Sequence, residues 1–467
     1  AHEVIIKQRE MQFSHWDQGR RFQVDVLAAL FGISAWLSVN AMFTQLPLLV
    51  QTAPEGWNLP SYLSIIVQVA NIGPILYSLS QMYCSKLISD SKLIYAILFL
   101  GCGSLVLLSF LYSQTWVIFG DLHSGPIFIL AFCISLVGCT SSVLFIPFMN
   151  NYPEVYLISY MIGEGLSGFV PSALSLIQGI GGNPTCLNTT SDSGEIIFVP
   201  SQPNPMFSTK VFFFIMFGIM MLSTISFFLL NNLPTCKKQK INRKVKKCAT
   251  VEYAIDSERR HSTEVENGET NKQPVESNGG KHESVKMTSQ FTSPSITPEL
   301  YTALLVLQTI ISFFANGALH SIQSYSCLPY GNTAYHLAVN FGSIANPLAC
   351  FISYFLPVKA AKWIFSISAV ISVFTTYLFT TALMSPYPPL QHSALGVFLN
   401  VFSWVTCIAL ISYTKLAIAS LLRHEGGRGL FWYGCVTQAG AALGSASMFY
   451  LVNFTHLFTS YDSCKML

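Results

Sequence analysis

Residues 124–150 read SGPIFILAFCISLVGCTSSVLFIPFMN, a stretch without a single acidic or basic side chain. As an α-helix this stretch is longer than the hydrocarbon core of a bilayer, which is roughly 30 Å thick and is spanned by about 20 apolar residues. The whole chain shares this composition, because 51% of its 467 residues are hydrophobic, only 10% are charged, and the mean hydropathy is +0.48. Soluble domains are about a quarter charged. The sequence therefore predicts an integral membrane protein.

Eleven stretches of this kind form two groups of predicted transmembrane helices. They cover residues 26–50, 60–83, 93–117, 124–150, 155–182, 211–233, 301–319, 333–356, 363–384, 395–413 and 430–452. A long hydrophilic segment separates the first six from the last five, so we predict an all-α membrane protein with two bundles in a 6+5 arrangement. The predicted domains are a cytoplasmic N-terminal segment (1–23), a six-helix bundle (24–233), a disordered cytoplasmic linker (234–298), a five-helix bundle (299–454) and an extracellular tail (455–467).

The basic residues predict the orientation, because Lys and Arg are retained on the cytoplasmic side of a membrane. With the N-terminus inside, all 25 Lys and Arg residues except Lys210 and Lys465 fall in predicted cytoplasmic segments. The same orientation puts Asn188, in an Asn-Thr-Thr glycosylation sequence, outside. A second acceptor sequence, at Asn453, lies at the end of its helix, where we expect no modification. We therefore predict a multi-pass protein with a cytoplasmic N-terminus and an extracellular C-terminus.

Several function classes lack their sequence signatures. The chain has no GxxxxGK[ST] loop for nucleotide phosphates, so it is not predicted to be an ATP-driven pump, and no nucleic-acid-binding pattern is visible. The chain has no CxxC pair and no His pair at helical spacing, so no metal site is predicted, and we expect no cofactor. Cys186, Cys327 and Cys464 are predicted to face the oxidising outer side, where two of them can form a disulfide, although the sequence does not assign the pair.

Polar side chains inside the predicted helices are the candidate substrate-binding residues, because a polar group is costly in lipid unless it faces the bundle interior. Glu164 is the only Asp, Glu, Lys or Arg within any of the eleven stretches. A solute with a full charge would call for a countercharge, so a single carboxylate favours a neutral, hydrogen-bonding solute. The alternative is a protonated structural acid between close-packed glycines.

The other candidates lie on predicted helices around Glu164. Helical spacing puts Trp36, Asn40 and Thr44 on one face of the first helix. Gln68 and Asn71 share a face of the second helix. Such amides can bind hydroxyls and ring carbonyls, but they also link neighbouring helices, at about 0.6 to 2 kcal/mol each. The remaining candidates are Gln45, Ser141, Asn316, Gln323, Tyr325, Tyr335 and His336.

Five sequence motifs resemble those of the vertebrate-type riboflavin transporters. They read PEGWNLPSYL at residues 54–63, ANIGP at 70–74, CTSSV at 139–143, GEGLSG at 163–168 and SYSCLPYG at 324–331. The likeness covers nearly the whole chain except the linker and the N-terminal segment. It implies a plasma-membrane carrier for riboflavin, facilitated or proton-stimulated, on an eleven-helix, major-facilitator-like fold similar to the equilibrative nucleoside transporters. Aromatic side chains would then stack the isoalloxazine ring, and amides would bind the ribityl chain.

Two positions depart from the family pattern. Gln45 stands before Leu-Pro where the family usually has glutamate, which puts proton coupling through that position in doubt. Tyr387 stands where a cysteine is common, so a family disulfide from there to the region of Cys464 is not expected.

We therefore predict uptake of riboflavin by alternating access, in which the two bundles rock about a central site. A carrier of another neutral polar solute, such as a nucleoside, is one alternative, and a membrane receptor without transport is another. An enzyme is not predicted, because Glu164 has no obvious acid–base partner, His336 being the nearest candidate. The expected partners are the small-molecule substrate and membrane lipid, with proton coupling left open.

Overall fold

The computed structural model of the protein is almost entirely helical, with two short β-hairpins. Most of the predicted N-terminal segment and linker, and part of the tail, lie outside the described residues. The described residues are 21–84, 89–118, 120–182, 185–190, 196–201, 204–240, 297–356, 360–423, 427–461 and 464.

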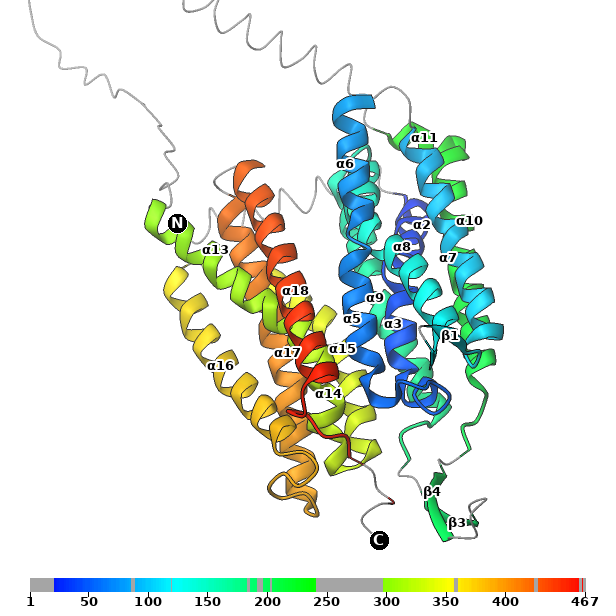
Figure 1. Cartoon of the computed structure of the whole chain (residues 1–467). Helices are drawn as coiled ribbons and strands as arrows, with labels where there is room; N and C mark the ends of the chain where they lie inside the picture. Colours follow the sequence, from blue (N-terminus) through cyan, green and yellow to red (C-terminus); the bar gives the residue numbers. More distant parts are fainter. Residues whose placement is uncertain are drawn as a thin grey trace, which may run out of the picture.

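The N-terminal bundle begins with a bent pair of helices, α2 (Phe22–Ile33) and α3 (Leu37–Thr44), which meet at 49° beside Trp36 (Figure 1). An aromatic cluster fills its core, where the ring centroid of Phe31 lies 4.6 Å from that of Phe145 and 5.0 Å from that of Phe227. The other helical elements are α4 (Leu46–Leu49), η1 (Gly56–Asn58), α5 (Leu59–Val69), α6 (Ile72–Cys84), α7 (Asp90–Leu111), α8 (Gly125–Met149), α9 (Glu154–Gln178), α10 (Thr209–Asn232) and α11 (Pro234–Gln239).

The C-terminal bundle lies beside the first and has a hydrophobic core of its own. Its first helix is interrupted by a π-helical turn, η2 (Phe313–Ala318), which lies between α13 (Pro298–Ser312) and α14 (Leu319–Cys327). The remaining elements are η3 (Leu328–Tyr330), α15 (Asn332–Phe355), α16 (Ala361–Leu383), α17 (Ala394–Arg423) and α18 (Gly427–Phe454).

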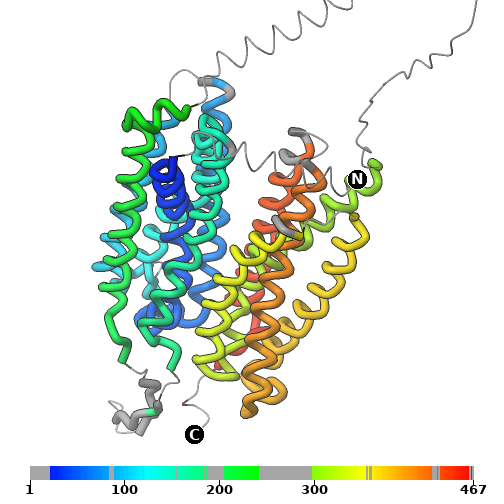
Figure 2. The backbone as a smooth tube through the Cα atoms, turned by 180° about the vertical axis from the view of Figure 1, so that it is seen from behind, coloured from blue at the N-terminus to red at the C-terminus, as the bar shows by residue number. Residues whose placement is uncertain are grey.

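The two ends of the bundles differ. One end, here called the hairpin end, carries the strand pairs β1 (Trp116–Ile118) with β2 (Asp121–His123) and β3 (Thr185–Thr190) with β4 (Ile196–Ser201). The opposite end, here called the linker end, carries α11 and the start of α13. The helices of the two bundles converge at the hairpin end and splay apart at the linker end in both views (Figures 1 and 2).

The structure confirms a polytopic helical membrane protein, but it does not confirm the predicted count of eleven crossings. Among the described residues, eight helices are long and apolar enough to cross a membrane, or nine if the bent pair α2 and α3 is one span. The two predicted crossings that do not meet this test are α9 and α15, although they have 25 and 24 residues. These two helices pack against each other across the boundary between the bundles, where polar residues are tolerated.

One predicted boundary is wrong in a way that matters for function. The tenth predicted helix ended at residue 413, whereas α17 continues to Arg423 and includes Lys415. Glu164 is therefore not the only charged residue inside the bundle helices. The apolar residues after Lys415, from Leu416 to Leu422, interrupted only by Ser420, were the available signal that the helix continues.

A disulfide joins the two halves of the chain at the hairpin end. Cys186, on β3, is bonded to Cys464, in the C-terminal tail, and the two cysteines are 278 positions apart in sequence. Cys327, the third cysteine predicted on this side, is a free thiol buried in the C-terminal bundle. The sequence left open which two of the three cysteines pair, and the structure assigns Cys186 and Cys464. Position 387, where the family often has a cysteine, is a tyrosine and takes no part in the bond.

Replacing Cys186 with serine is expected to lower the thermal stability of the purified protein, because a disulfide that closes a long loop contributes about 2–4 kcal/mol. The same variant should free Cys464, which a maleimide would then label in the purified protein. Peptide mapping by mass spectrometry measures both the bond and the label. Cys435→Ser is the control, since Cys435 is an exposed free thiol with no disulfide partner in the described chain. Labelling of Cys464 in the unaltered protein would contradict the assignment.

Candidate substrate site

Glu164 lies where three helices come together. A Cβ atom at the neighbouring Gly163 would lie 1.9 Å from the backbone oxygen of Ala29, so α9 and α2 pack backbone to backbone. A Cβ atom at Gly165 would lie 3.0 Å from Pro347 of α15, which belongs to the other bundle. The Glu164 side chain is half-buried, and no described residue donates a hydrogen bond to its carboxylate. An acid so placed is available to a ligand between the bundles.

A lysine of the other bundle lies near the same region. The Lys415 ammonium on α17 donates a hydrogen bond to Asn316 Oδ1 at 2.8 Å. Asn316 belongs to the π-helical turn η2, a rare geometry that is frequent at functional sites. Cys350, on α15, lies close enough to both Glu164 and Lys415 for either charge to act on it electrostatically. One acid from the first bundle and one base from the second therefore flank a common region.

His320 is a second residue that the sequence reasoning missed. It follows Asn316 by one helical turn and is exposed, although it lies within a helix of the bundle. The ring of Phe43, on α3 of the N-terminal bundle, has its centroid 5.6 Å from that of His320. His320 therefore faces the space between the bundles, not lipid. Gln323 follows on the same helix and is half-buried.

The predicted residues of the first helix lie on the other side of this space. Asn40 donates a hydrogen bond to Ser167 Oγ of α9 at 3.5 Å, and it is half-buried. Thr44 donates to the backbone oxygen of Asn40, and Trp36 packs on Gly138 of α8. Asn40 is thus the predicted amide that the structure brings closest to the Glu164 segment of α9.

Four further candidates make hydrogen bonds within the N-terminal bundle. Gln45 is fully buried and donates from Nε2 to Gln178 Oε1 at 2.6 Å, and Ser141 is fully buried and donates to the backbone oxygen of Gly138. The Gln45 contact links the break between α3 and α4 to α9, whereas the Ser141 contact lies within α8. Asn71 donates to Gln68 Oε1 at 3.2 Å at the break between α5 and α6, where both are half-buried.

Tyr325, Tyr335 and His336 contribute to the closed hairpin end. The Tyr325 hydroxyl donates to Asn58 Oδ1 at 2.5 Å, and the Tyr335 ring lies edge-on to Trp57 with centroids 5.1 Å apart. His336 Nε2 lies 3.0 Å from Ser175 Oγ. These three pairs, each with one residue from either bundle, are called here the hairpin-end gate. Sequence reasoning did not find Trp57, Asn58 or Ser175 as their partners.

Backbone oxygens extend the closure. Asn332 donates from Nδ2 to the oxygens of Ile180 and Gly182, at 3.1 and 2.8 Å, and Thr333 donates to that of Gly181 at 2.7 Å. Asn453 donates to Ser61 Oγ at 2.9 Å, so its side chain is engaged in a contact between the bundles. This engagement agrees with the expectation that Asn453 carries no glycan. The described structure is therefore a state closed at the hairpin end.

Among the described residues, no group of three or more His, Cys, Asp or Glu side chains is placed to hold a metal. The family model described as "Solute carrier family 52, riboflavin transporter" matches residues 20–460. The chain belongs to this family of riboflavin transporters. Its polar interior is thus the interior of a solute carrier, and its family and fold are those of transporters, not enzymes.

Curated relatives share the full length of this transporter. It is 37% identical to Riboflavin transporter 2 of Salmo salar, over 94% of this chain and 98% of that protein. It is 38% identical to member 3-B of the family from Danio rerio, with the same coverage. It is 33% identical to member 3 from Homo sapiens, over 95% of this chain and 99% of the relative.

Solved structures with a similar fold are transporters of distant sequence. A crystal structure of an aspartate-to-alanine mutant of the nucleoside transporter NupG matches with a TM-score of 0.54 at 10% identity, covering 94% of this chain and 93% of that chain. A POT family transporter in complex with 5-aminolevulinic acid matches with a TM-score of 0.52 at 12% identity, covering 92% and 91%. These likenesses show the fold, and the major-facilitator-like arrangement predicted from the resemblance is confirmed.

Proposed function

We propose that this chain carries riboflavin across the plasma membrane by alternating access. The observation that carries the proposal is the placement of Glu164 on one bundle and Lys415 with Asn316 on the other, at the boundary of two bundles that are in contact at the hairpin end. A substrate bound between them would contact both bundles. Its binding can therefore change their relative position, which is what alternating access requires.

The chemistry of the flanking residues fits a neutral flavin. Lys415 is a donor for a ring carbonyl, and Glu164 is an acceptor for a ring N–H or a ribityl hydroxyl. One positive and one negative side chain leave no net charge to be balanced by the solute. Asn40 and Gln323 supply amides, and Phe43 supplies an aromatic surface beside His320.

The basic residues support an orientation with the linker end in the cytoplasm. Lys92, Lys237, Lys238 and Lys362 lie at the linker end of the described helices, whereas Lys210 lies at the start of α10, toward the hairpin end. The hairpin end would then be extracellular, where an oxidising environment suits the Cys186–Cys464 disulfide. Asn188, on β3 at that end, is the proposed glycosylation site. The described state would be open toward the cytoplasm.

The proposal predicts saturable uptake of labelled riboflavin by cells that express this chain, above the level of cells without it. Unlabelled riboflavin should compete, whereas adenosine should not, and flavin mononucleotide should compete poorly because its phosphate adds charge to a site with no net charge. Measurement at acidic and neutral outside pH shows whether protons contribute. Background uptake, with the protein shown at the cell surface, would contradict riboflavin transport. Saturable uptake of labelled adenosine, without uptake of riboflavin, would identify a nucleoside carrier.

A further inference from the structure

The loop at residues 54–60 carries two contacts of the hairpin-end gate on two consecutive residues. Trp57 reaches Tyr335, and Asn58 accepts the hydrogen bond of Tyr325. Both tyrosines are only 1% exposed, so the contacts are made inside the closed interface. Gly56 begins this turn with φ at 53°, a left-handed conformation that glycine adopts without strain. For Trp57 and Asn58 to contact the C-terminal bundle, the turn must be fixed to the N-terminal bundle.

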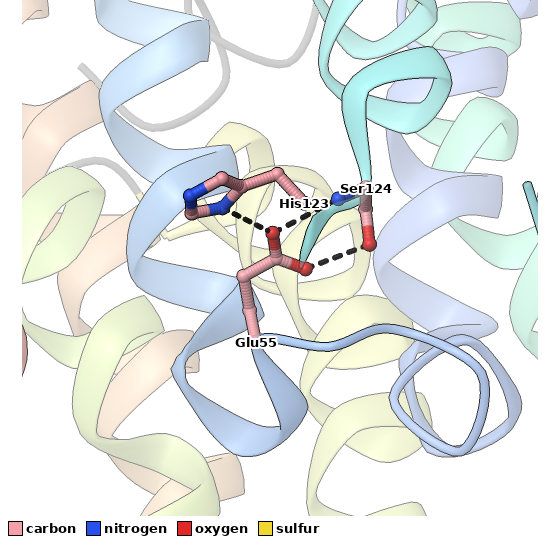
Figure 3. A network of polar contacts seen from close by, with 3 residues as sticks. All are labelled: Glu55, His123 and Ser124. Atoms are coloured by element: carbon pink, nitrogen blue, oxygen red, sulfur yellow. Dashed lines mark hydrogen bonds and ion pairs between the residues drawn. The ribbon is translucent and has the colours of Figure 1, made fainter. Parts of the chain in front are cut away.

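The carboxylate of Glu55 holds the turn on the start of α8 (Figure 3). Glu55 Oε1 accepts a hydrogen bond from the backbone N–H of Ser124 at 3.0 Å, and Oε2 accepts one from the Ser124 hydroxyl at 2.7 Å. His123 Nδ1 lies 3.0 Å from Oε1. The Glu55 side chain is 3% exposed, so its charge depends on these partners and on the positive end of α8.

We propose that Glu55 is a positioning residue for transport: it fixes the η1 turn to α8 so that Trp57 and Asn58 complete the hairpin-end gate, and protonated His123 strengthens this hold. The proposal deepens the proposed function and rests on it for the orientation of the chain. Neither residue contacts the space beside Glu164 and Lys415. They act on transport only through the closed position of the turn.

The His123 side chain is 28% exposed, whereas the Glu55 carboxylate that it touches is shielded. Protonated His123 forms an ion pair with Glu55, whereas the neutral ring offers at most a hydrogen bond. Among the described residues, the other titratable groups near this contact are Asp121, two residues earlier on β2, and Tyr62 on α5, on which Glu55 acts electrostatically. His456 of the tail lines a pocket with Asn58 and Tyr325, but His123 is the described histidine that pairs with Glu55. The gate should be held most firmly at acidic outside pH and should loosen as the pH rises.

The test uses Cys327 as a native reporter. This free thiol is fully buried in the C-terminal bundle two residues after Tyr325, so a membrane-impermeant maleimide outside the cell reaches it only when the packing around Tyr325 at the hairpin end opens. Labelling of the full-length chain on intact cells is followed by peptide mass spectrometry from about pH 5.5 to about pH 8, across the titration of histidine. We expect slow labelling at acidic pH and faster labelling as the pH rises. Glu55→Gln should label about ten-fold faster at acidic pH, with little pH response, because it loses hydrogen bonds to a charged group.

His123→Gln is the second variant, and it keeps the proposal testable if Glu55→Gln does not reach the surface. It should label at the high-pH rate of the unaltered chain at every pH. Asp90→Asn is the matched control, because Asp90 accepts hydrogen bonds from Tyr77 and Gln81 at the linker end, far from the gate. It should leave both rate and pH response unchanged.

Two results would overturn the proposal: a flat pH response in the unaltered chain, or unaltered labelling in both Glu55→Gln and His123→Gln. Labelling of Cys327 only in permeabilised cells would instead show that the orientation is reversed. Because the label needs no substrate, these outcomes are distinct from a failure of riboflavin uptake.

Discussion

Replacing Gly163 with alanine is expected to destabilise the folded transporter strongly, because the added methyl group has no room. The added Cβ atom would lie 1.9 Å from the backbone oxygen of Ala29. Backbone atoms of α2 cannot turn aside as a side chain can, so α2 and α9 would have to move apart. Overpacking in a filled interior costs about 1–3 kcal/mol and sometimes more. Because the displaced helix also carries Glu164, uptake should fall with the yield of folded protein. Thermal unfolding in detergent and surface expression measure these effects.

Gly103→Ala is the matched control for this substitution. Gly103 lies inside α7, and a Cβ atom there would meet nothing within 4 Å. Since glycine in a helix interior is about 1 kcal/mol less favourable than alanine, this control should be neutral or stabilising. If Gly163→Ala behaved like Gly103→Ala, the close approach of α2 and α9 would not exist in the folded protein. Gly32→Ala tests the same contact from the other helix, since its Cβ atom would lie 2.1 Å from the backbone oxygen of Tyr160.

The helices were predictable from the sequence wherever lipid contact requires an unbroken apolar run. Helix α8 runs from Gly125 to Met149, within one residue at each end of the predicted stretch 124–150. The same criterion is weaker inside the protein. Helices α9 and α15 were predicted as the stretches 155–182 and 333–356, but they face each other and carry polar residues, so they are not among the helices that are long and apolar enough to count as crossings. Lys415 was misplaced for the same reason, because a charged residue that faces a bundle interior looks like the end of a helix.

The contacts between the bundles could not be predicted from the sequence. Tyr325 and Asn58 are 267 residues apart, and nothing in local periodicity relates their positions. Sequence reasoning therefore selected Tyr325, Tyr335 and His336 as residues that line a site, whereas the structure also gives each a partner in the closed gate. Asn40 and Glu164 could be selected as candidate site residues because a polar residue in an apolar helix is visible in the sequence itself. The Glu55 network was not, since a carboxylate in a loop carries no such signal.

Replacing Lys415 with methionine is expected to reduce riboflavin uptake by about 10- to 100-fold at equal surface expression. Methionine keeps an unbranched apolar side chain, so α17 should still pack, but the charged donor is lost. A hydrogen bond to a charged group contributes about 1.5–3 kcal/mol, and each 1.4 kcal/mol is a factor of ten in affinity. If Lys415 donates to a ring carbonyl of the substrate, most of the loss should appear as a higher KM. Initial uptake rates over a range of riboflavin concentrations measure KM and the maximal rate separately.

Lys362→Met is the control, because Lys362 is an exposed lysine on α16 at the linker end, and it should leave uptake unchanged. Glu164→Gln should also reduce uptake, and the double variant with Lys415→Met separates two roles for the charges. If each side chain binds the substrate independently, the losses multiply. If instead the two charges mainly balance each other between the bundles, the double variant should transport better than either single one, since an unpaired interior charge is costlier than none. Unchanged uptake in Lys415→Met would show that this lysine does not bind the substrate. The amides and Glu164 would then be the remaining candidate binding residues.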